Sequence, residues 1–525
     1  MLRSRLSLAI IALIASLGMA SAQFDRTYTW TGTVNTWTGA TGWTVDVGLA
    51  NPFPDSNTSR ALFNNNVNTT VNVNDNFTLH TLEFGNSAGS FTLNNNTLTM
   101  ATNGAVTFGS AGSQTVNTNI TLSGALAVNH NLSGTNTING TISGVGQTLT
   151  HTSVAGSNFI YGGNVSLGSL VKSGNGTLTF SGSMVAFATA LTLNAGTTNI
   201  NTTSTSTIAG NITGAGNLAQ NGSGTTILTG TNSYGGITTI SAGTLQVGSG
   251  GTVGSIGAGA ITNNSALSFS RSDATSIANN ISGSGNLTKS GAGTMTYTGA
   301  GTYTGTTTIS GGSLVVNGTL DNTGATVTAL SGTSLGGTGT INRAVIINSG
   351  SIIRGGDVGT IGTLNVTGTT TVLGAATNGG QITTRTSGAT SGGSGTVADP
   401  FILSSNSLLA LGGTGVLNLD PTAGKFRFLI ENDSTLAQFK SYSLVLATAN
   451  NGNQFQRAGI SLDAFTAADF DVFGQNSANP FTDLQLTRTG NNLILTFVTV
   501  PEPGLMLGMG AGVLALGAFL RKRFA

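Results

Sequence analysis

The chain has 525 residues, of which 79 are glycine, about 15% against a usual ~7%, and only 7% are charged against a usual ~25%. The net charge of +1 gives no basic surface for nucleic acid, and the lack of cysteine excludes disulfides and thiolate metal sites. A hydrophobic content of 38% separates the chain from charged disordered proteins. Disorder of the Gly/Thr/Asn-rich tract is an alternative, which applies most to 384–396.

Residues 1–22 have the features of a secretory signal peptide. Two arginines precede an apolar run at 6–17, and the small residues Ala20 and Ala22 form the expected cleavage site, so that the mature chain starts at Gln23. The alternative is an uncleaved N-terminal anchor, for which the run is short.

Residues 23–94 hold all the tryptophan of the protein, at Trp30, Trp37 and Trp43, and end in alternating runs such as 77–84 that predict strands. We interpret this region as the cap that the open end of a stacked-coil core requires. The alternative is that the tryptophans contact a glycan, because aromatic faces pack well on sugar rings.

Residues 95–398 contain a repeated unit, seen most clearly at 212–248 and again at 281–317. Aligned without a gap, the two copies agree at 19 of 37 positions. The shared positions include the glycines and the spaced apolar residues. A true internal repeat of this kind indicates a chain built from similar structural units.

Apolar residues within each copy stand two apart, as Met295 and Tyr297 do, which is strand spacing. Glycine, asparagine and serine clusters between them allow tight corners. Between Phe84 and Ser270 the only charged residue is Lys172, so Thr, Asn and Ser must solvate the surface. The pattern predicts an all-β, right-handed parallel β-helix with about 20 to 25 residues per coil.

The repeated unit and the tryptophan-rich start resemble the autotransporter-associated β-strand repeat over roughly residues 30–368. The resemblance implies a passenger region of an exported bacterial protein. The last residues are not a series of amphipathic barrel strands, so we do not expect this chain to export itself.

Residues 399–498 differ in composition, with ten of the 23 phenylalanines of the protein. Strands are expected at 425–430, 442–447 and 493–498. We interpret the region as the final coils followed by a β-rich cap, with a separate small β-sandwich as the alternative.

Residues 499–525 combine three features in a fixed order: a Pro-Glu-Pro motif, an apolar segment at 504–520 and a basic end. The motif and the basic residues are Val500, Pro501, Glu502 and Pro503, then Arg521, Lys522 and Arg523. Seventeen apolar residues are about the minimum for one membrane-spanning helix, and the basic cluster would stay on the cytoplasmic side.

This end resembles the PEP-CTERM sorting tail of Gram-negative bacteria. The resemblance implies that exosortase, a membrane transpeptidase-like cysteine protease, recognises the tail and cuts it at the motif. It also implies an inner-membrane-anchored precursor that moves to the cell surface, the outer envelope or an exopolysaccharide-containing matrix. The alternative is an uncleaved tail anchor.

The sequence contains few candidate catalytic residues. Glycoside hydrolysis needs two carboxylates about 5–10 Å apart, and the segment 85–269 contains none. The other candidate residues are scattered along the sequence: Asp273, Asp321 and Asp357; His80, His130 and His151; and Asp469 with Asp471, a weak candidate for a cation site. We therefore expect no metal site and no cofactor.

The sequence therefore favours an exported, non-enzymatic structural or adhesive protein. One alternative is a polysaccharide-binding adhesin that uses the tryptophan end. A less favoured alternative is a β-helical polysaccharide-degrading enzyme.

Overall fold

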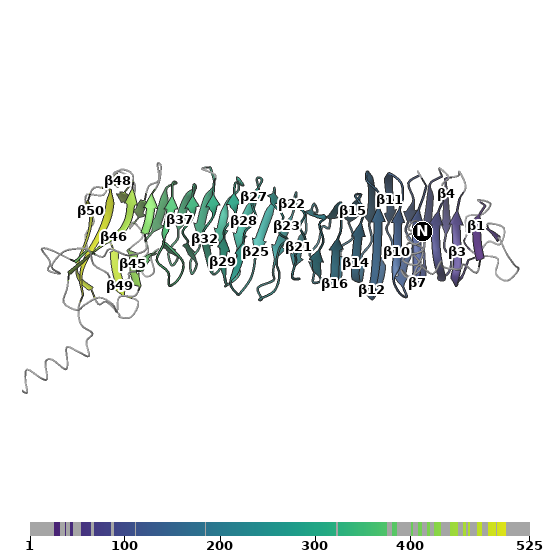
Figure 1. Ribbon diagram of the computed structural model, residues 1–525, viewed down its shortest axis with the longest axis horizontal. Helices are drawn as coiled ribbons and strands as arrows, with labels where there is room; N and C mark the ends of the chain where they lie inside the picture. Colours follow the sequence, from purple (N-terminus) through teal and green to yellow (C-terminus); the bar gives the residue numbers. More distant parts are fainter. Residues whose placement is uncertain are drawn as a thin grey trace, which may run out of the picture. The chain divides into compact units, whose positions relative to one another are not determined.

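All the regular structure of the described residues is β-strand (Figure 1). The computed structural model describes residues 26–31, 37, 43–45, 54–64, 68–85, 89–110, 112–183, 185–321, 324–374, 381–385, 401–402, 408–411, 417–420, 425–431, 441–449, 455–457, 460–461, 470–474, 481–489 and 491–499. The chain divides into two compact units near Thr238, and Ser255–Gly257 belongs to the first. Each unit is a parallel β-solenoid.

Two sheets of parallel strands build most of the first unit. Its first sheet consists of β1 (Arg26–Trp30), β3 (Ser56–Phe63), β5 (Phe77–Phe84), β7 (Thr97–Phe108), β10 (Leu126–His130), β12 (Ile142–Ser153), β14 (Val165–Ser173), β16 (Val185–Leu193) and β19 (Asn211–Thr213). Its second sheet consists of β4 (Thr69–Asn72), β6 (Phe91–Asn94), β8 (Thr115–Val116), β11 (Gly134–Ile138), β13 (Ser157–Tyr161), β15 (Thr177–Phe180), β17 (Thr197–Ile200) and β20 (Asn217–Gln220).

The register of these strands gives the coil length. Val128 pairs with His151, 23 positions later, and Leu178 pairs with Thr198, 20 positions later. The expected coil of about 20 to 25 residues is confirmed. Alternation along each strand is also as predicted, because Leu178 and Phe180 are fully buried while Thr179 between them is half-buried. Each such buried side chain contributes about 1.5–3 kcal/mol to folding.

The core of the first unit begins with a column of stacked aromatic rings. Trp30, Phe63, Phe84 and Phe108 occupy paired positions in successive strands of the first sheet. Their ring centroids lie 5.9, 5.4 and 5.2 Å apart in that order. A column of large rings in contact excludes water from the first four coils and fixes their register.

Most coils of the second unit contribute one strand to each of three sheets. One sheet consists of β23 (Thr244–Val247), β25 (Ala266–Phe269), β28 (Asn286–Lys289), β31 (Thr307–Ile309), β34 (Thr326–Ala329), β37 (Ala344–Ile347), β40 (Thr370–Leu373), β44 (Leu417–Asp420) and β47 (Phe455–Arg457). The next consists of β26 (Thr275–Ile277), β29 (Thr294–Tyr297), β32 (Ser313–Val316), β35 (Ser334–Gly336), β38 (Ile352–Arg354), β41 (Gln381–Arg385), β45 (Phe426–Glu431) and β49 (Phe470–Gly474). The third contains β24 (Ile261–Asn263), β27 (Ile281–Ser282), β30 (Ala300–Gly301), β33 (Thr319–Leu320), β36 (Thr340–Ile341), β39 (Thr363–Val366), β43 (Leu408–Leu411) and β46 (Ser441–Ala449).

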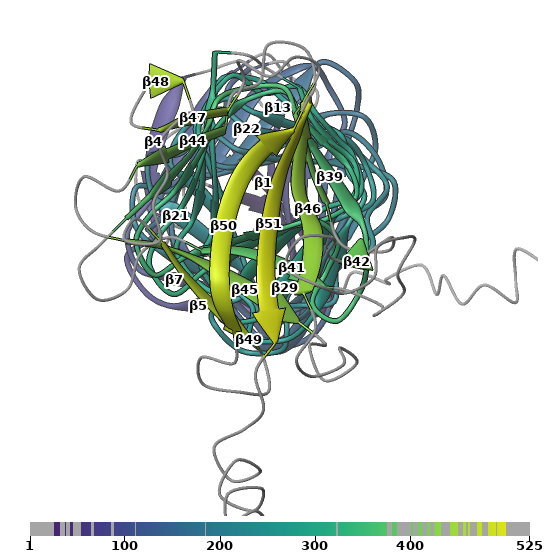
Figure 2. The same ribbon diagram turned by 90° about the vertical axis from the view of Figure 1, so that its left-hand side faces the viewer.

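The second unit ends in antiparallel strands. β46 pairs in parallel with β43, but its other edge pairs antiparallel with β51 (Asn492–Thr499), which pairs antiparallel with β50 (Phe481–Thr489). These three strands lie side by side in Figure 2. The chain reverses direction here instead of continuing the coil, and this reversal covers the edge of β46 that a further coil would use.

Candidate functional site

The first two tryptophans belong to the core. The side chains of Trp30 and Trp37 are 1% and 0% exposed, and both rings pack against Phe63 at 5.9 and 6.0 Å. The Trp37 ring also stacks on Phe77 at 5.7 Å. Neither ring offers a face to a sugar, so the glycan contact that the sequence suggested at these two positions has no exposed aromatic surface.

The third tryptophan begins a short edge strand. β2 (Trp43–Val45) pairs antiparallel with β1, which places Trp43 opposite Trp30 along the backbone. The side chain of Trp43 lies outside what the structure describes. The signal peptide with Ala20, Ala22 and Gln23 is also outside the described residues.

The C-terminal features that the sequence predicted lie outside the described residues as well. These are the sorting motif Val500–Pro503, the apolar segment 504–520 and the basic residues Arg521, Lys522 and Arg523. In the part of the chain that the structure does describe, we find no helix with the length and hydropathy that crossing a membrane requires.

The three histidines lie in different coils, and two of them belong to the core. His80 is half-buried in β5, whereas His130 and His151 are almost fully buried in β10 and β12. Phe159 contacts both buried rings, with centroids 5.6 Å from His130 and 4.8 Å from His151. These two rings therefore pack as core aromatics. Among the described side chains, neither histidine forms the nucleophile–base pair that hydrolases use.

The surroundings of the two buried histidines favour the neutral imidazole. Asn136 Nδ2 donates to His130 Nε2 at 2.9 Å, and His151 Nδ1 lies 3.2 Å from the Tyr161 hydroxyl. The other ring nitrogens have no hydrogen-bond partner among the described residues. Burial lowers the pKa of His130, and burial together with the charge of Lys172 and the neighbouring His130 holds the pKa of His151 well below its ordinary value.

Two lysines lie inside the solenoid, and each caps the carbonyls of a glycine corner. Lys172 Nζ donates to the carbonyl oxygens of Ser173, Gly174 and Ala195 at 3.1, 2.6 and 3.3 Å. Lys172 is 0% exposed, and burial lowers its pKa to about 8. One coil's corner is thus tied to the next by an ammonium group whose three donors are all used.

Lys289 repeats this arrangement in the second unit. Its Nζ donates to the carbonyl oxygens of Gly291 and Gly311, the latter at 3.0 Å. Burial lowers the pKa of Lys289 to about 8 as well. Gln220 takes the same place in the first unit, where its Nε2 donates to Gly222 O at 2.8 Å. The sequence analysis missed these corner clamps, although the alternation of buried Leu287 with Lys289 is a signal that the lysine points inward.

Arg343 is the largest fully buried charged side chain of the described residues, with 0% exposure. Its guanidinium lies over the Tyr303 ring at 4.0 Å and donates to the carbonyl oxygens of Tyr303 and Gly305 at 2.7 and 3.1 Å. It also donates to Thr307 Oγ1 at 3.3 Å. The side chain therefore links the segment from Tyr303 to Thr307, which leads into β31, to the start of β37. No feature of the sequence indicated that Arg343 is buried.

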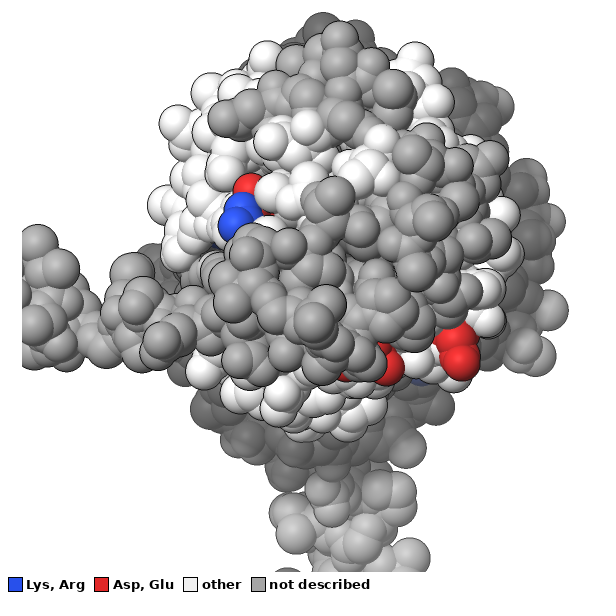
Figure 3. All heavy atoms as spheres, turned by 90° about the vertical axis from the view of Figure 1, so that its right-hand side faces the viewer, with Lys and Arg blue, Asp and Glu red and all other residues white. Residues whose placement is uncertain are grey.

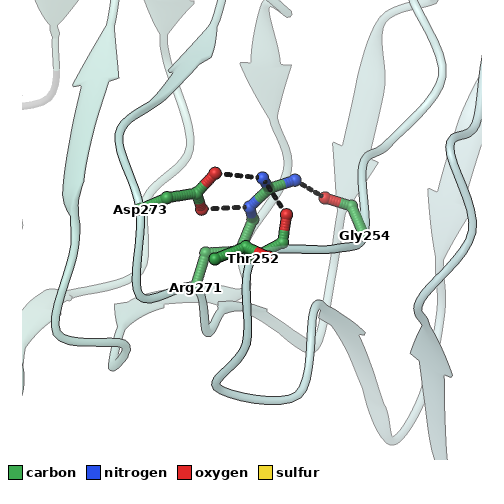
Figure 4. A network of polar contacts seen from close by, with 4 residues as sticks. All are labelled: Thr252, Gly254, Arg271 and Asp273. Carbon is green, nitrogen blue, oxygen red and sulfur yellow. Dashed lines mark hydrogen bonds and ion pairs between the residues drawn. The ribbon is translucent and has the colours of Figure 1, made fainter.

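Asp273 belongs to a network that holds a glycine-rich loop (Figure 4). Arg271 donates to both Asp273 oxygens at 2.8 and 2.6 Å, to Thr252 O at 2.6 Å and to Gly254 O. The guanidinium beside Asp273 lowers the pKa of its carboxyl. The carboxylate thus has a structural role in fixing Arg271 against the loop.

The other candidate carboxylates are also engaged singly. Asp321 accepts from Asn342 Nδ2 at 2.8 Å, and Asp357 accepts from the backbone of Val358 in its own turn. Asp471 forms an exposed ion pair with Lys425 at 2.8 Å. Asp469 lies outside the described residues. Within the described part of the chain, no group of three or more His, Cys, Asp or Glu side chains could hold a metal ion.

The described outer surface between residues 85 and 270 is free of charged side chains. No charged residue occurs from 85 to 171, and Lys172 points inward, so hydroxyl and amide groups face the solvent along most of the first unit. Figure 3 views the end near β1 and shows only a few charged side chains among the described residues there. The described part of this segment thus offers an uncharged hydrogen-bonding surface, and the described side chains assemble no catalytic centre.

Comparison with known proteins matches two segments of the repeat region. Residues 218–247 and 287–316 match the family model of the Passenger-associated-transport-repeat. A segment of 87 residues is 41% identical to the "Adhesin BmaC autotransporter" of Brucella suis biovar 1 (strain 1330). That alignment covers 16% of this chain and 2% of the relative, so the chain spans only a small part of that protein's length. Both matches support the resemblance to autotransporter-associated repeats, and the family model places it at residues 218–247 and 287–316.

Proposed function

We propose that this protein is an exported, non-enzymatic adhesive or structural protein of the cell surface or the extracellular matrix. The observation that carries the proposal is the coincidence of a parallel β-solenoid with two segments that match the Passenger-associated-transport-repeat. The similarity of 87 residues to an adhesin supports an adhesive role. A long polar surface without charge suits repeated weak contacts with other surfaces or with matrix polymers.

A deletion strain of the native host tests this role. The strain is expected to attach less to surfaces or to release more matrix than the parent, and the intact gene is expected to restore the parental behaviour. Equal attachment and equal matrix retention in parent and deletion strain would reject an adhesive or structural role. Depolymerisation of a polysaccharide by the purified protein would instead favour an enzyme.

For the C-terminal end we propose processing by an exosortase-type enzyme at Val500–Pro503. In this scheme, the segment 504–520 anchors the precursor in the inner membrane until the tail is removed. The support is the order of the motif, the apolar segment and the basic end in the sequence. Mass spectrometry of the C-terminal peptide from surface material tests it: a terminus near 500–503 supports processing, and an intact Ala525 excludes it.

A further inference from the structure

A grid of neutral side chains covers the outer face of four neighbouring strands in the first unit. In the second sheet of that unit, Thr70 pairs with Thr92, Thr92 with Thr115, and Thr115 with Thr137. All four lie at outward positions of their strands and are exposed or half-buried. Because neighbouring strands lie about 4.8 Å apart, their hydroxyl groups form a straight row along the coils.

A row of asparagines runs beside the threonines, two residues further along each strand. Asn72 pairs with Asn94. Asn117 Nδ2 donates to Asn94 Oδ1 at 2.7 Å, and Asn139 Nδ2 donates to Asn117 Oδ1 at 2.9 Å. These hydrogen bonds fix the orientation of the amides before any ligand arrives, which lowers the entropy cost of binding.

The grid has a defined end at the next strand, β13. Ile160 takes the place of threonine in its row. Gly162 takes the place of asparagine, and a Cβ there would lie 2.2 Å from Asn139 Oδ1. The array therefore extends over four coils, a length of roughly 15 Å.

The chemistry of the grid selects against charged partners. The strands β6, β8 and β11 belong to the segment 85–171, which contains no Lys, Arg, Asp or Glu. A nucleic acid, an anionic lipid or an acidic polysaccharide would find no opposite charge there. Hydroxyl and amide groups both donate and accept hydrogen bonds, as the hydroxyl groups of sugars do.

We propose that this threonine–asparagine grid binds a neutral polysaccharide chain laid along the stacked coils. The row spacing is close to the length of one sugar residue in an extended chain, so successive sugars meet successive coils. Each contact is weak alone, and the repeat adds them along one polymer. The inference rests on the proposed function only for the presence of this surface outside the cell, and it places the glycan site on the grid and not on the buried Trp30 and Trp37.

The test uses the purified full-length protein with three probes: microcrystalline cellulose, a soluble neutral galactomannan and the charged polygalacturonate. The grid variant carries Thr92→Val and Thr115→Val, which remove two hydroxyl groups at nearly constant volume. The matched control carries Thr177→Val and Thr197→Val, a pair at outward positions of the same sheet beyond the end of the grid. A Thr92→Ser, Thr115→Ser variant keeps the hydroxyls.

The proposal predicts binding to at least one neutral probe and weaker or absent binding to polygalacturonate. The grid variant should bind about tenfold more weakly, while the control and the serine variant bind like the parent. Equal circular dichroism and urea midpoints of the variants establish that folding is intact. If a variant fails this check, a competition experiment with the parent protein takes its place: free cello-oligosaccharides should release the parent from cellulose, and no release would count against the proposal.

Three outcomes overturn the proposal: no binding of the parent to either neutral probe, unchanged binding by the grid variant, or equal loss in grid variant and control. A fourth outcome would also overturn the proposal: the parent is a dimer that binds no glycan, and the grid variant is a monomer. That result would assign the face to contact with a second copy of the chain. Failure of surface adhesion in the host, with glycan binding intact in the purified protein, would reject the proposed function alone.

Discussion

The guanidinium carbon of Arg343 lies 4.0 Å from the centre of the Tyr303 ring, and Nη2 of the same arginine donates to the Tyr303 carbonyl oxygen at 2.7 Å. Arg343 thus satisfies backbone carbonyls that lie 38 to 42 residues earlier in the chain and the Thr307 hydroxyl 36 residues earlier. A buried charge held by a ring face and by carbonyl oxygens is costly to disturb, because its partners cannot turn to water.

Arg343→Met should therefore destabilise the second unit strongly. The carbonyls of Tyr303 and Gly305 would lose their donors, and we expect a loss of about 3 kcal/mol in the free energy of unfolding. Urea unfolding followed by circular dichroism measures it. Lys425→Met is the comparison, because its ion pair with Asp471 is exposed and should contribute less than about 1 kcal/mol. Equal small shifts for both variants would contradict the structural role of Arg343.

Glycine corners provide a second prediction within the first unit. A Cβ on Gly222 would lie 2.1 Å from the backbone oxygen of Thr202, whereas a Cβ on Gly235 would meet nothing within 4 Å. Gly222→Ala should lower the unfolding free energy by about 2 kcal/mol or more, since backbone must move. Gly235→Ala should be neutral or stabilising by up to about 1 kcal/mol. The same urea experiment separates the two, and tolerance of both would show that the coils stack less closely than described.

Because of the two buried lysines, the free energy of unfolding should change with pH in the alkaline range. Burial lowers the pKa of Lys172 and of Lys289 to about 8, below the ordinary value of 10.5. Above pH 8 the folded chain loses these protons while the unfolded chain keeps them, so the unfolding free energy should rise with pH from about 8 towards 10. Above pH 10 the trend should reverse, because burial raises the pKa of Tyr234 to about 12 and the unfolded chain then releases protons first.

Urea midpoints between pH 7.5 and 10 measure this dependence. A Lys172→Met, Lys289→Met variant should show a flatter profile than the parent. A profile that is flat in the parent, or equally steep in the variant, would mean that the ammonium groups are not desolvated as the structure indicates.

Because of the two buried histidines, the free energy of unfolding should also change with pH in the acidic range. Burial lowers the pKa of His130 and His151 below 6.5, so that the unfolded chain binds protons first as the pH falls. The unfolding free energy should therefore fall below about pH 6.5. A His151→Phe, Tyr161→Phe variant removes one histidine and the hydroxyl beside it, and its urea midpoint should vary less between pH 7 and 5. Persistence of the full pH dependence in this variant would place its cause elsewhere.

The strand pattern could be predicted from the sequence because alternation reports directly on burial. Met295 and Tyr297, which stand two apart in the repeat, are both 0% exposed in β29. The strands expected at 425–430, 442–447 and 493–498 correspond to β45, β46 and β51. The same rule applied to Lys289 would have placed it inside.

The candidate sites were harder to predict, because they depend on the register in which residues of one coil pair with residues of the next. The burial of Arg343 follows from contacts with a coil about 40 residues earlier, and no local pattern encodes that register. The threonine–asparagine grid is likewise invisible without the pairing, since Thr92 and Thr115 are 23 residues apart in a sequence full of threonine. Composition could exclude a charged surface, but only the register shows an ordered neutral one.

Labelling of intact cells tests the central claim most directly. Antibodies raised against the repeats at 212–317 would be applied to unpermeabilised cells of the native host and measured by flow cytometry, with the deletion strain as the blank. An exported adhesive solenoid predicts clear labelling of intact cells or of their surrounding matrix. Labelling that appears only after permeabilisation would place the repeats inside the cell and contradict the proposed function.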